Sequence, residues 1–283
     1  MKKGKLTVPD LIAMKAAGDK IVVLTAYDVS FARMIDGAGI EVVLVGDSLG
    51  MVALGYDSTV PVTMDEMLHH CRAASRGIDR ALLIGDMPFM SYQTSGYDAV
   101  VNAGRFIKEG RCDAVKLEGG SEVCETVSRI VRAGVAVMGH IGLTPQTAGN
   151  MGGYKVQGKD LASARKLLES ARDLEKAGAF AVVLECIPDK LAGLISREIS
   201  IPTIGIGAGV DCDGQVLVTP DLLGMFEKFV PKFVKSYVNL APQIKEAVNS
   251  YKSEVKNGTY PDDEHSFGMQ IDLDDLISNK NEN

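Results

Sequence analysis

The sequence lacks the cysteine spacing that a disulfide framework or a structural zinc site requires. It has five cysteines, an odd number, and they are widely spread without any C-x-x-C pair. They are Cys71, Cys112, Cys124, Cys186 and Cys212. We therefore expect reduced thiols, most of them buried in a protein from a reducing compartment.

Long basic runs and long apolar runs are also missing. The net charge is −7, and the densest basic cluster is Lys2, Lys3 and Lys5, so a polyanion has little to bind. No apolar run approaches the ~18 residues that cross a bilayer, and the N-terminus has no apolar signal segment. We expect no nucleic-acid partner, no membrane partner and a cytoplasmic protein.

The composition is that of an ordinary globular protein, with 46% hydrophobic and 24% charged residues in a chain of 283. One large α/β barrel of ~250 residues accounts for this length. We predict a single domain over residues 1–283, with an N-terminal helix at residues 7–17 and a C-terminal helical extension. From about residue 262 the sequence turns acidic and aperiodic, which predicts a tail that is mobile or packed on a neighbouring subunit.

Short apolar runs that alternate with amphipathic stretches indicate parallel strands joined by crossover helices. The eight runs are 21–25, 42–46, 81–85, 114–117, 136–139, 181–184, 202–206 and, less clearly, 215–218. The helical stretches between them are 63–77, 99–110, 122–134, 160–178 and 189–198, and a further one is 242–256. Eight repeats favour a (β/α)8 TIM barrel over a doubly wound sheet.

The glycines of a dinucleotide-binding fingerprint are incomplete. Gly205, Gly207 and Gly209 give G-x-G-x-G, but Val210 stands where a third fingerprint glycine is needed. These glycines predict a tight turn after the seventh strand. The turn either lets the backbone approach a ligand or has no ligand role.

Three carboxylates follow consecutive strands, at the barrel end where catalytic groups collect. They are Asp47, Asp86 and Glu118, which we expect at equivalent depth on one side of the barrel mouth. Crowded acids need a countercharge, and Mg2+ prefers carboxylate, water and substrate oxygens. The alternative for each acid alone is a helix N-cap or a salt bridge.

Lys116 precedes Glu118 by two residues, so both side chains face the barrel cavity. Three roles are open for this lysine. It can hold a substrate carboxylate, it can form a Schiff base if burial depresses its pKa, or it can pair with Glu118 or Asp86 without touching substrate.

Glu185 directly follows the sixth apolar run, away from the three acids, and is a candidate general base or a capping residue. His140 directly follows the fifth run. We prefer to interpret it as a barrel histidine with its hydrogen bonds satisfied, and the alternative is a polar neighbour of the ligand.

Ten segments together closely resemble the ketopantoate (3-methyl-2-oxobutanoate) hydroxymethyltransferase family. They are Leu24–Asp28, Val45–Met51, Asp57–Thr59, Asp86–Met90, Lys116–Gly120, Gly139–Gln146, Gly152–Gly158, Leu184–Cys186, Gly205–Gly209 and Pro261–Phe267. The resemblance spans nearly the whole chain apart from about the first 20 and last 15 residues. The acidic tail after Phe267 is the one part that the family pattern does not explain.

The resemblance implies a barrel like those of phosphoenolpyruvate mutase and isocitrate lyase, and transfer of a hydroxymethyl group from 5,10-methylenetetrahydrofolate to 3-methyl-2-oxobutanoate. The product is 2-dehydropantoate, formed through a Mg2+-stabilised enolate on the way to pantothenate and coenzyme A. By the family pattern Asp47, Asp86 and Glu118 surround the metal, and Glu185 accepts the proton. Asp47, Ser48, Asp86 and Lys116 bind the 2-oxo acid. Such enzymes are commonly homodecamers.

Two other functions remain as alternatives. A lyase or mutase of the phosphoenolpyruvate mutase kind shares the barrel, the acids and the enolate, and only the folate donor distinguishes it. A catalytically silent metabolite-binding barrel is expected to lack a strand-end acid, and none of the acids is missing.

Overall fold

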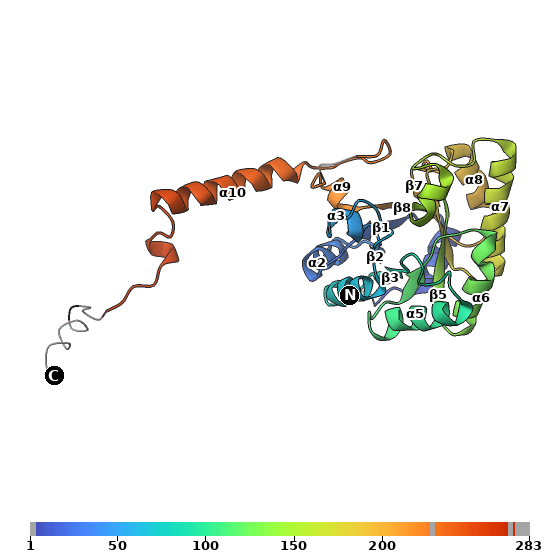
Figure 1. The fold of residues 1–283 in the computed structure, drawn as a ribbon, viewed down its shortest axis with the longest axis horizontal. Helices are drawn as coiled ribbons and strands as arrows, with labels where there is room; N and C mark the ends of the chain where they lie inside the picture. Colours follow the sequence, from blue (N-terminus) through green and yellow to red (C-terminus); the bar gives the residue numbers. More distant parts are fainter. Residues whose placement is uncertain (1–3, 227–229, 271–273, 275–283) are drawn as a thin grey trace. The chain divides into compact units, whose positions relative to one another are not determined.

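The chain folds into a closed barrel of eight parallel strands, each paired with its neighbours in chain order (Figure 1). A computed structural model describes residues 4–226, 230–270 and 274. The strands are β1 (Ile21–Thr25), β2 (Val42–Val45), β3 (Leu82–Asp86), β4 (Ala114–Lys116), β5 (Ala136–Gly142), β6 (Ala181–Glu185), β7 (Thr203–Ile206) and β8 (Gly214–Leu217). The predicted (β/α)8 barrel is confirmed, including the eighth strand, which pairs with β1 and closes the ring.

Helices surround the barrel and connect successive strands (Figure 1). They are α1 (Val8–Ala17), α2 (Val29–Gly37), α3 (Leu49–Val52), α4 (Met64–Ser75), α5 (Gly96–Lys108), α6 (Cys124–Arg132), α7 (Leu161–Lys176), α8 (Asp189–Glu198) and α9 (Thr219–Leu222), with 3-10 turns η1 (Ser121–Val123) and η2 (Pro145–Met151). The predicted N-terminal helix is α1, and the five predicted crossover helices correspond to α4 to α8. The helices α2, α3 and α9 were not predicted from the sequence.

Side chains alternate between two apolar layers along each strand. Leu82 and Ile84 of β3 pack inside the barrel, whereas Leu83 packs between barrel and helices. Gly85 also faces outward, where an added Cβ would lie 2.3 Å from the ring of Phe106, so only glycine lets α5 pack this closely. The same alternation directs the next residue, Asp86, into the barrel.

The cysteines follow the expectation of mostly buried, unpaired thiols. All five cysteines are free, and Cys71, Cys112 and Cys212 are buried. No helix in residues 4–226 and 230–270 is long and apolar enough to cross a bilayer.

Two compact units divide the chain, Met1–Tyr237 with the barrel and Val238–Asn283. The second unit contains α10 (Leu240–Asn257), which is the predicted C-terminal helix, and a 3-10 turn η3 (Asp263–His265). The assignment of both units to one domain stays a prediction. The predicted tail falls largely on residues 271–273 and 275–283, which lie outside the described residues.

Candidate active site

A cavity of about 540 Å³ opens at the carboxyl ends of the strands. Charged side chains from separate strand ends line it, namely Asp47, Asp86, Lys116, Glu118, Glu185 and Asp221. Parallel strands present these ends on one face of the barrel, so residues distant in sequence meet here. The cavity therefore contains every site residue that the sequence predicted, Ser48 included.

Asp86 and Lys116 form a buried ion pair at the base of the cavity. They are directly opposite each other on β3 and β4, and Lys116 Nζ donates to Asp86 Oδ1 at 2.6 Å. Burial alone would lower the pKa of Lys116, but the charges of Asp86, Glu118 and Asp47 outweigh it and raise that pKa. The Schiff-base interpretation required a depressed pKa and is not supported. The ion pair predicted as an alternative is present.

Asp47 lies beside this pair, just beyond the end of β2. Its backbone N–H donates to Asp86 Oδ2 at 3.2 Å, and its own Oδ2 accepts a hydrogen bond from Gln146 Nε2 at 2.9 Å. Burial, followed by the negative charge of Asp86, raises the pKa of Asp47 to about 7. A nearby cation would favour the charged form of this carboxylate.

Glu118 is the third buried acid, and it is only 5% exposed. Its Oε1 lies 3.9 Å from Lys116 Nζ, and its Oε2 accepts a hydrogen bond from the Gln146 backbone N–H at 3.1 Å. Burial is the main cause that raises the pKa of Glu118 well above its usual value.

The predicted equivalent depth of the three acids is wrong in detail. Val45 pairs with Gly85 and Asp86 pairs with Lys116, so Asp47 lies one residue, and Glu118 two residues, beyond the level of Asp86. The acids surround Lys116 instead of forming one ring. Side-chain reach, which the strand pattern does not contain, brings them together.

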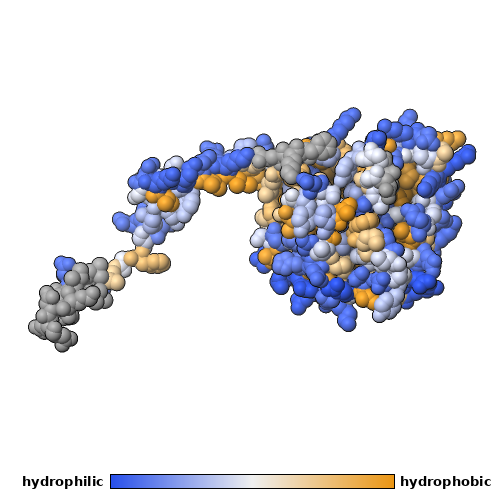
Figure 2. Space-filling view, viewed as in Figure 1, coloured by the Kyte–Doolittle hydropathy of each residue, from blue (hydrophilic) through white to orange (hydrophobic). Residues whose placement is uncertain are grey.

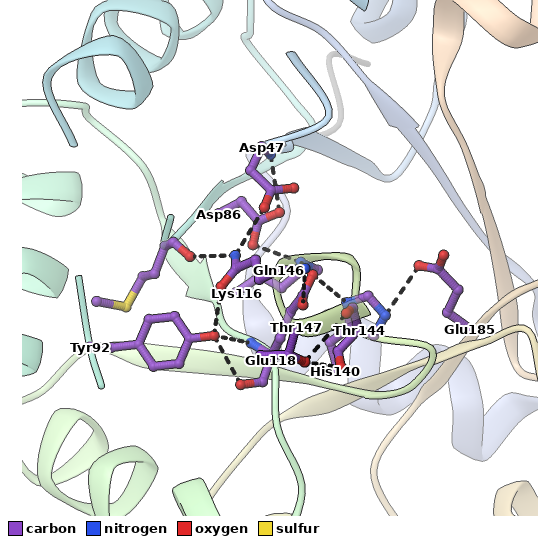
Figure 3. A network of polar contacts seen from close by, with 11 residues as sticks. Asp47, Asp86, Tyr92, Lys116, Glu118, His140, Thr144, Gln146, Thr147 and Glu185 are labelled. Atoms are coloured by element: carbon purple, nitrogen blue, oxygen red, sulfur yellow. Dashed lines mark hydrogen bonds and ion pairs between the residues drawn. The ribbon is translucent and has the colours of Figure 1, made fainter. Parts of the chain in front are cut away.

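Gln146 and Tyr92 connect the acids, and neither was predicted as a site residue. Gln146 follows β5 in η2, and Tyr92 lies between β3 and α5. The Tyr92 hydroxyl lies 2.9 Å from both Gln146 Oε1 and the Glu118 carbonyl oxygen, and it accepts from the Glu118 N–H at 3.1 Å. Figure 3 shows this network below Asp47 and Asp86. A loop glutamine beside a strand end was the available sequence signal for Gln146.

His140 lies between Glu118, two residues beyond β4, and Glu185 at the end of β6 (Figure 3). Its Nδ1 is 3.6 Å from Glu118 Oε1, and its Nε2 is 3.2 Å from Glu185 Oε2. Neither ring nitrogen meets hydrogen-bond geometry with any described residue, although the side chain is buried. Our preferred interpretation of a satisfied barrel histidine is therefore wrong. Burial lowers the pKa of His140, which favours the neutral ring.

Glu185 and Ser48 complete the predicted set. Glu185 ends β6 after Ala181 and Val183, which pack inside the barrel, so the strand directs its carboxylate into the cavity. Ser48 Oγ lies 2.9 Å from the hydroxyl of the buried Tyr27. Burial raises the pKa of Tyr27, so this phenol remains protonated.

The turn predicted from the glycines after β7 is confirmed. Gly207 and Gly209 have φ of 64° and 82°, a region that favours glycine. A Cβ on Gly207 would lie 2.8 Å from Phe233 Cδ1, so the turn accepts the ring of a later segment. Phe233 lines the cavity, so this contact shapes its wall.

The charged cavity suits a hard cation held jointly by protein and substrate. Among the described residues, no group of three or more His, Cys, Asp or Glu side chains could hold a metal ion by itself. Asp47 and Asp86 interact at the cavity base, where burial and mutual repulsion raise the pKa of Asp47. Mg2+ is commonly held by one or two carboxylates with water and substrate oxygens, so this donor set fits Mg2+ better than zinc.

Solved structures with related folds cover almost the entire chain. Phosphoenolpyruvate phosphomutase from Streptomyces platensis subsp. rosaceus matches with a TM-score of 0.60 at 15% identity, over 97% of this chain and 96% of that chain. A 2,3-dimethylmalate lyase of the PEP mutase/isocitrate lyase superfamily matches with a TM-score of 0.58 at 13% identity, over 96% and 98%. At such low identity this likeness shows the fold alone, and it confirms the predicted fold class.

Curated relatives match at much higher identity. The 3-methyl-2-oxobutanoate hydroxymethyltransferase of Desulfotalea psychrophila is 59% identical over 96% of this chain and 98% of its own length. The enzyme of that name from Enterococcus faecalis is 59% identical over 92% and 94%. The sequence model described as ketopantoate hydroxymethyltransferase matches residues 5–263. This chain therefore belongs to the ketopantoate hydroxymethyltransferase family.

Proposed function

We propose that the protein transfers a hydroxymethyl group from 5,10-methylenetetrahydrofolate to 3-methyl-2-oxobutanoate, giving 2-dehydropantoate for pantothenate and coenzyme A biosynthesis. In this reaction the C3–H bond of the keto acid breaks and C3 bonds to the one-carbon unit. The bonds from that carbon to the folate nitrogens break, and water supplies the hydroxyl oxygen. The family and its relatives support a hydroxymethyltransferase, and the donor and metal are our proposal.

One observation carries the proposal. The cavity separates a group of buried acids around Lys116 from a single carboxylate, Glu185, with His140 between them (Figure 3). Proton removal next to a ketone needs positive charge at the keto oxygen and a base on the other side of the substrate. Protonated Lys116 and a cation held by Asp47 and Asp86 would supply the positive charge, and Glu185 would be the base.

Asp47 and Asp86 are the residues that would hold Mg2+, with Glu118 adding negative charge close by. When bound, Mg2+ supplies positive charge that stabilises the charge developing on the keto oxygen. Lys116 remains protonated because three acids raise its pKa, so it can hold the substrate carboxylate. Ser48, already hydrogen-bonded to Tyr27, can donate to a second substrate oxygen.

Glu185 is the proposed base that takes the C3 proton. It is more exposed than the other acids, with its side chain 14% exposed against 2% for Asp86, and it faces the cavity. His140 Nε2 lies 3.2 Å from Glu185 Oε2, so the neutral ring can orient the carboxylate by a hydrogen bond once either side chain turns.

The metal requirement is tested without folate. The protein is treated with EDTA and incubated with 3-methyl-2-oxobutanoate in D2O, and loss of the C3 proton signal is followed by NMR. We expect no exchange until Mg2+ is added. Exchange and keto-acid binding at full strength in the metal-free protein would refute the metal's role.

The base is tested by Glu185→Gln, with the exposed Glu125→Gln as its matched control. We expect the first variant to lose C3 exchange by about 100-fold or more while it still binds Mg2+, and the control to behave as wild type. Persistent exchange in Glu185→Gln would exclude this residue as the base.

The folate donor separates this function from the lyase or mutase alternative. Incubation with methylenetetrahydrofolate, keto acid and Mg2+ should yield 2-dehydropantoate by mass spectrometry. Absence of the product would reject the transferase. The relatives named above are hydroxymethyltransferases, which favours this outcome.

We also propose a cytoplasmic homodecamer. Support for self-association lies in α10, where Ile244, Val248, Tyr251 and Val255 recur at helical spacing and are 46–59% exposed. Figure 2 shows apolar side chains along one side of this helix. Such a face is typical of an interface. Light scattering after gel filtration should give a mass near ten chains, and a monomer mass would reject the assembly.

A further inference from the structure

The cavity is larger than the keto acid requires. At about 30 Å³ for each of its eight non-hydrogen atoms, 3-methyl-2-oxobutanoate would take roughly 240 Å³. The cavity measures about 540 Å³. More than half of it therefore remains for a second ligand, and the wall away from the metal-binding acids has side chains without an assigned role.

Asp221 is a carboxylate on that wall. It lies in α9, directly after β8, and β8 pairs with β1 on the far side of the ring from β4 and β5. Its Oδ1 is buried and has no hydrogen-bond partner among the described residues. Buried acceptors are almost always paired, so an unpaired carboxylate oxygen in a ligand cavity indicates a missing donor.

The carboxylate of Asp221 is charged for most of its time at neutral pH. Burial raises the pKa of Asp221 to about 6, which is still below neutrality. Its buried oxygen therefore acts mainly as an acceptor. A ligand that satisfies it must present N–H or O–H groups.

The backbone around Asp221 is fixed from both sides. Thr219 Oγ1 donates to the Thr25 carbonyl at 2.6 Å, and the Thr219 N–H donates to Thr25 Oγ1 at 3.0 Å. Ser236 Oγ donates to the Asp221 carbonyl at 3.0 Å. The carboxylate is thus presented by a preorganised turn, which reduces the entropic cost of binding.

Apolar and aromatic side chains form the wall near this acid. Those that line the cavity from the last third of the chain include Val216, Leu217, Val218, Phe226, Phe233 and Val234. They offer an apolar surface on which a flat ring could pack, together with the acceptor of Asp221. A mostly apolar lining with a few polar groups is usual for a small-molecule site. The exposed Lys155 and Lys232 also line the cavity and suit an acidic tail that leaves it.

We propose that Asp221 binds the pterin ring of the folate donor by accepting hydrogen bonds from its ring N3–H and its 2-amino group. These two donors are adjacent and parallel, as in the guanidinium fork that pairs with carboxylates. The inference rests on the proposed function, because it presumes a folate donor. It assigns the β8 side of the cavity to folate and the β2–β4 side to the keto acid.

The test compares Asp221→Asn with the exposed control Asp211→Asn, both loaded with Mg2+. We expect Asp221→Asn to raise the KM for methylenetetrahydrofolate about 20-fold or more, because asparagine presents one acceptor and a repelling amide. C3 exchange, measured without folate, should change far less, and the control should match wild type. An unchanged donor KM in Asp221→Asn would overturn the proposal.

A ligand analogue gives a second measurement, which tests the same contact from the side of the ligand. A tetrahydrofolate analogue with a methyl group in place of the 2-amino group should bind wild type about 10-fold more weakly than tetrahydrofolate, by calorimetry. The same replacement should cost Asp221→Asn much less. Equal losses in both proteins would refute the contact. If wild type makes no 2-dehydropantoate from methylenetetrahydrofolate, the proposed function itself fails, which is a separate outcome.

Discussion

The side chain of Gln146 donates a hydrogen bond from Nε2 to Oδ2 of Asp47 at 2.9 Å. It joins the loop after β5 to the end of β2, which is three strands away in the ring. The same amide donates to the Met87 carbonyl at 3.0 Å and accepts at Oε1 from Tyr92. One buried glutamine thus orients the carboxylate that we assign to the metal.

Replacement of Gln146 by leucine should weaken metal binding without unfolding the barrel. Loss of the amide leaves Asp47 without its donor, and such supporting contacts are typically worth about 10- to 100-fold in metal affinity. Calorimetric titration with Mg2+ measures the change. The control is Gln243→Leu on α10, whose amide donates to the Asn239 carbonyl at 3.3 Å. Unchanged affinity in Gln146→Leu would show that Asp47 needs no such support.

Replacement of Tyr92 by phenylalanine should lower stability, because the Glu118 N–H and Gln146 Oε1 lose their buried partner. An unsatisfied buried group costs about 1–3 kcal/mol. Urea denaturation of the metal-free protein gives the difference, and Tyr97→Phe at a 76% exposed tyrosine is the control. Equal midpoints for the two variants would contradict the role of the Tyr92 hydroxyl.

The pKa of Asp47, raised from its usual 3.8 to about 7, predicts how stability changes with pH. The folded state binds the proton more tightly than the unfolded state. This contribution is therefore complete below about pH 4 and is lost as the pH rises through about 7. We expect the metal-free protein to lose stability from about pH 4 to about pH 7.

The variant Asp47→Asn removes that titration and can still accept from Gln146. At about pH 8 without metal, its free energy of unfolding should exceed that of wild type by about 1–3 kcal/mol. Thermal melts with and without Mg2+ test this, and Mg2+ should stabilise wild type but not the variant. A variant less stable than wild type at that pH would show that burial of the charged Asp47 carboxylate does not destabilise the folded protein.

Gly207→Ala should disturb the cavity wall. At φ of 64° a non-glycine residue is strained, and the new Cβ would meet Phe233 at 2.8 Å. We expect a loss of about 1–2 kcal/mol of stability and a higher KM for the substrates. Gly104→Ala, in open space within α5, should be neutral or stabilising by the same melts. Wild-type behaviour of Gly207→Ala would mean that the segment around Phe233 adapts freely.

Lys116 should form no imine with the keto acid, because three acids keep its amine protonated. Treatment with 3-methyl-2-oxobutanoate and sodium borohydride should leave the mass of the protein unchanged. A reduced adduct on a peptide that contains Lys116 would restore the Schiff-base alternative.

The strands were predictable because parallel barrel strands are buried on both faces and form continuous apolar runs. The least accurate end is that of β5, which continues to Gly142 although the apolar run stops at Gly139. The reason is that His140 faces the cavity from within the strand and interrupts the run. α2 was missed although the Asp28 side chain caps the N–H groups of Ser30 and Phe31.

The site was predictable where strands, or the two or three residues just beyond their ends, contain it. Asp86, Lys116 and Glu185 lie in strands, so a period of two directs them inward. Tyr92, Gln146 and Asp221 come from a loop, a 3-10 turn and a four-residue helix, whose paths follow no period. Their contacts depend on tertiary structure.

Closure of the ring also limits how the chain can be shortened or assembled. β1 ends at residue 25 and its last partner, β8, begins at residue 214, so almost two hundred residues must be present before the final seam forms. A nascent or truncated chain that stops earlier keeps two open sheet edges, which promote aggregation. The barrel is therefore expected to fold only when the chain extends through β8. N-terminal fragments that stop earlier should be insoluble instead of weakly active.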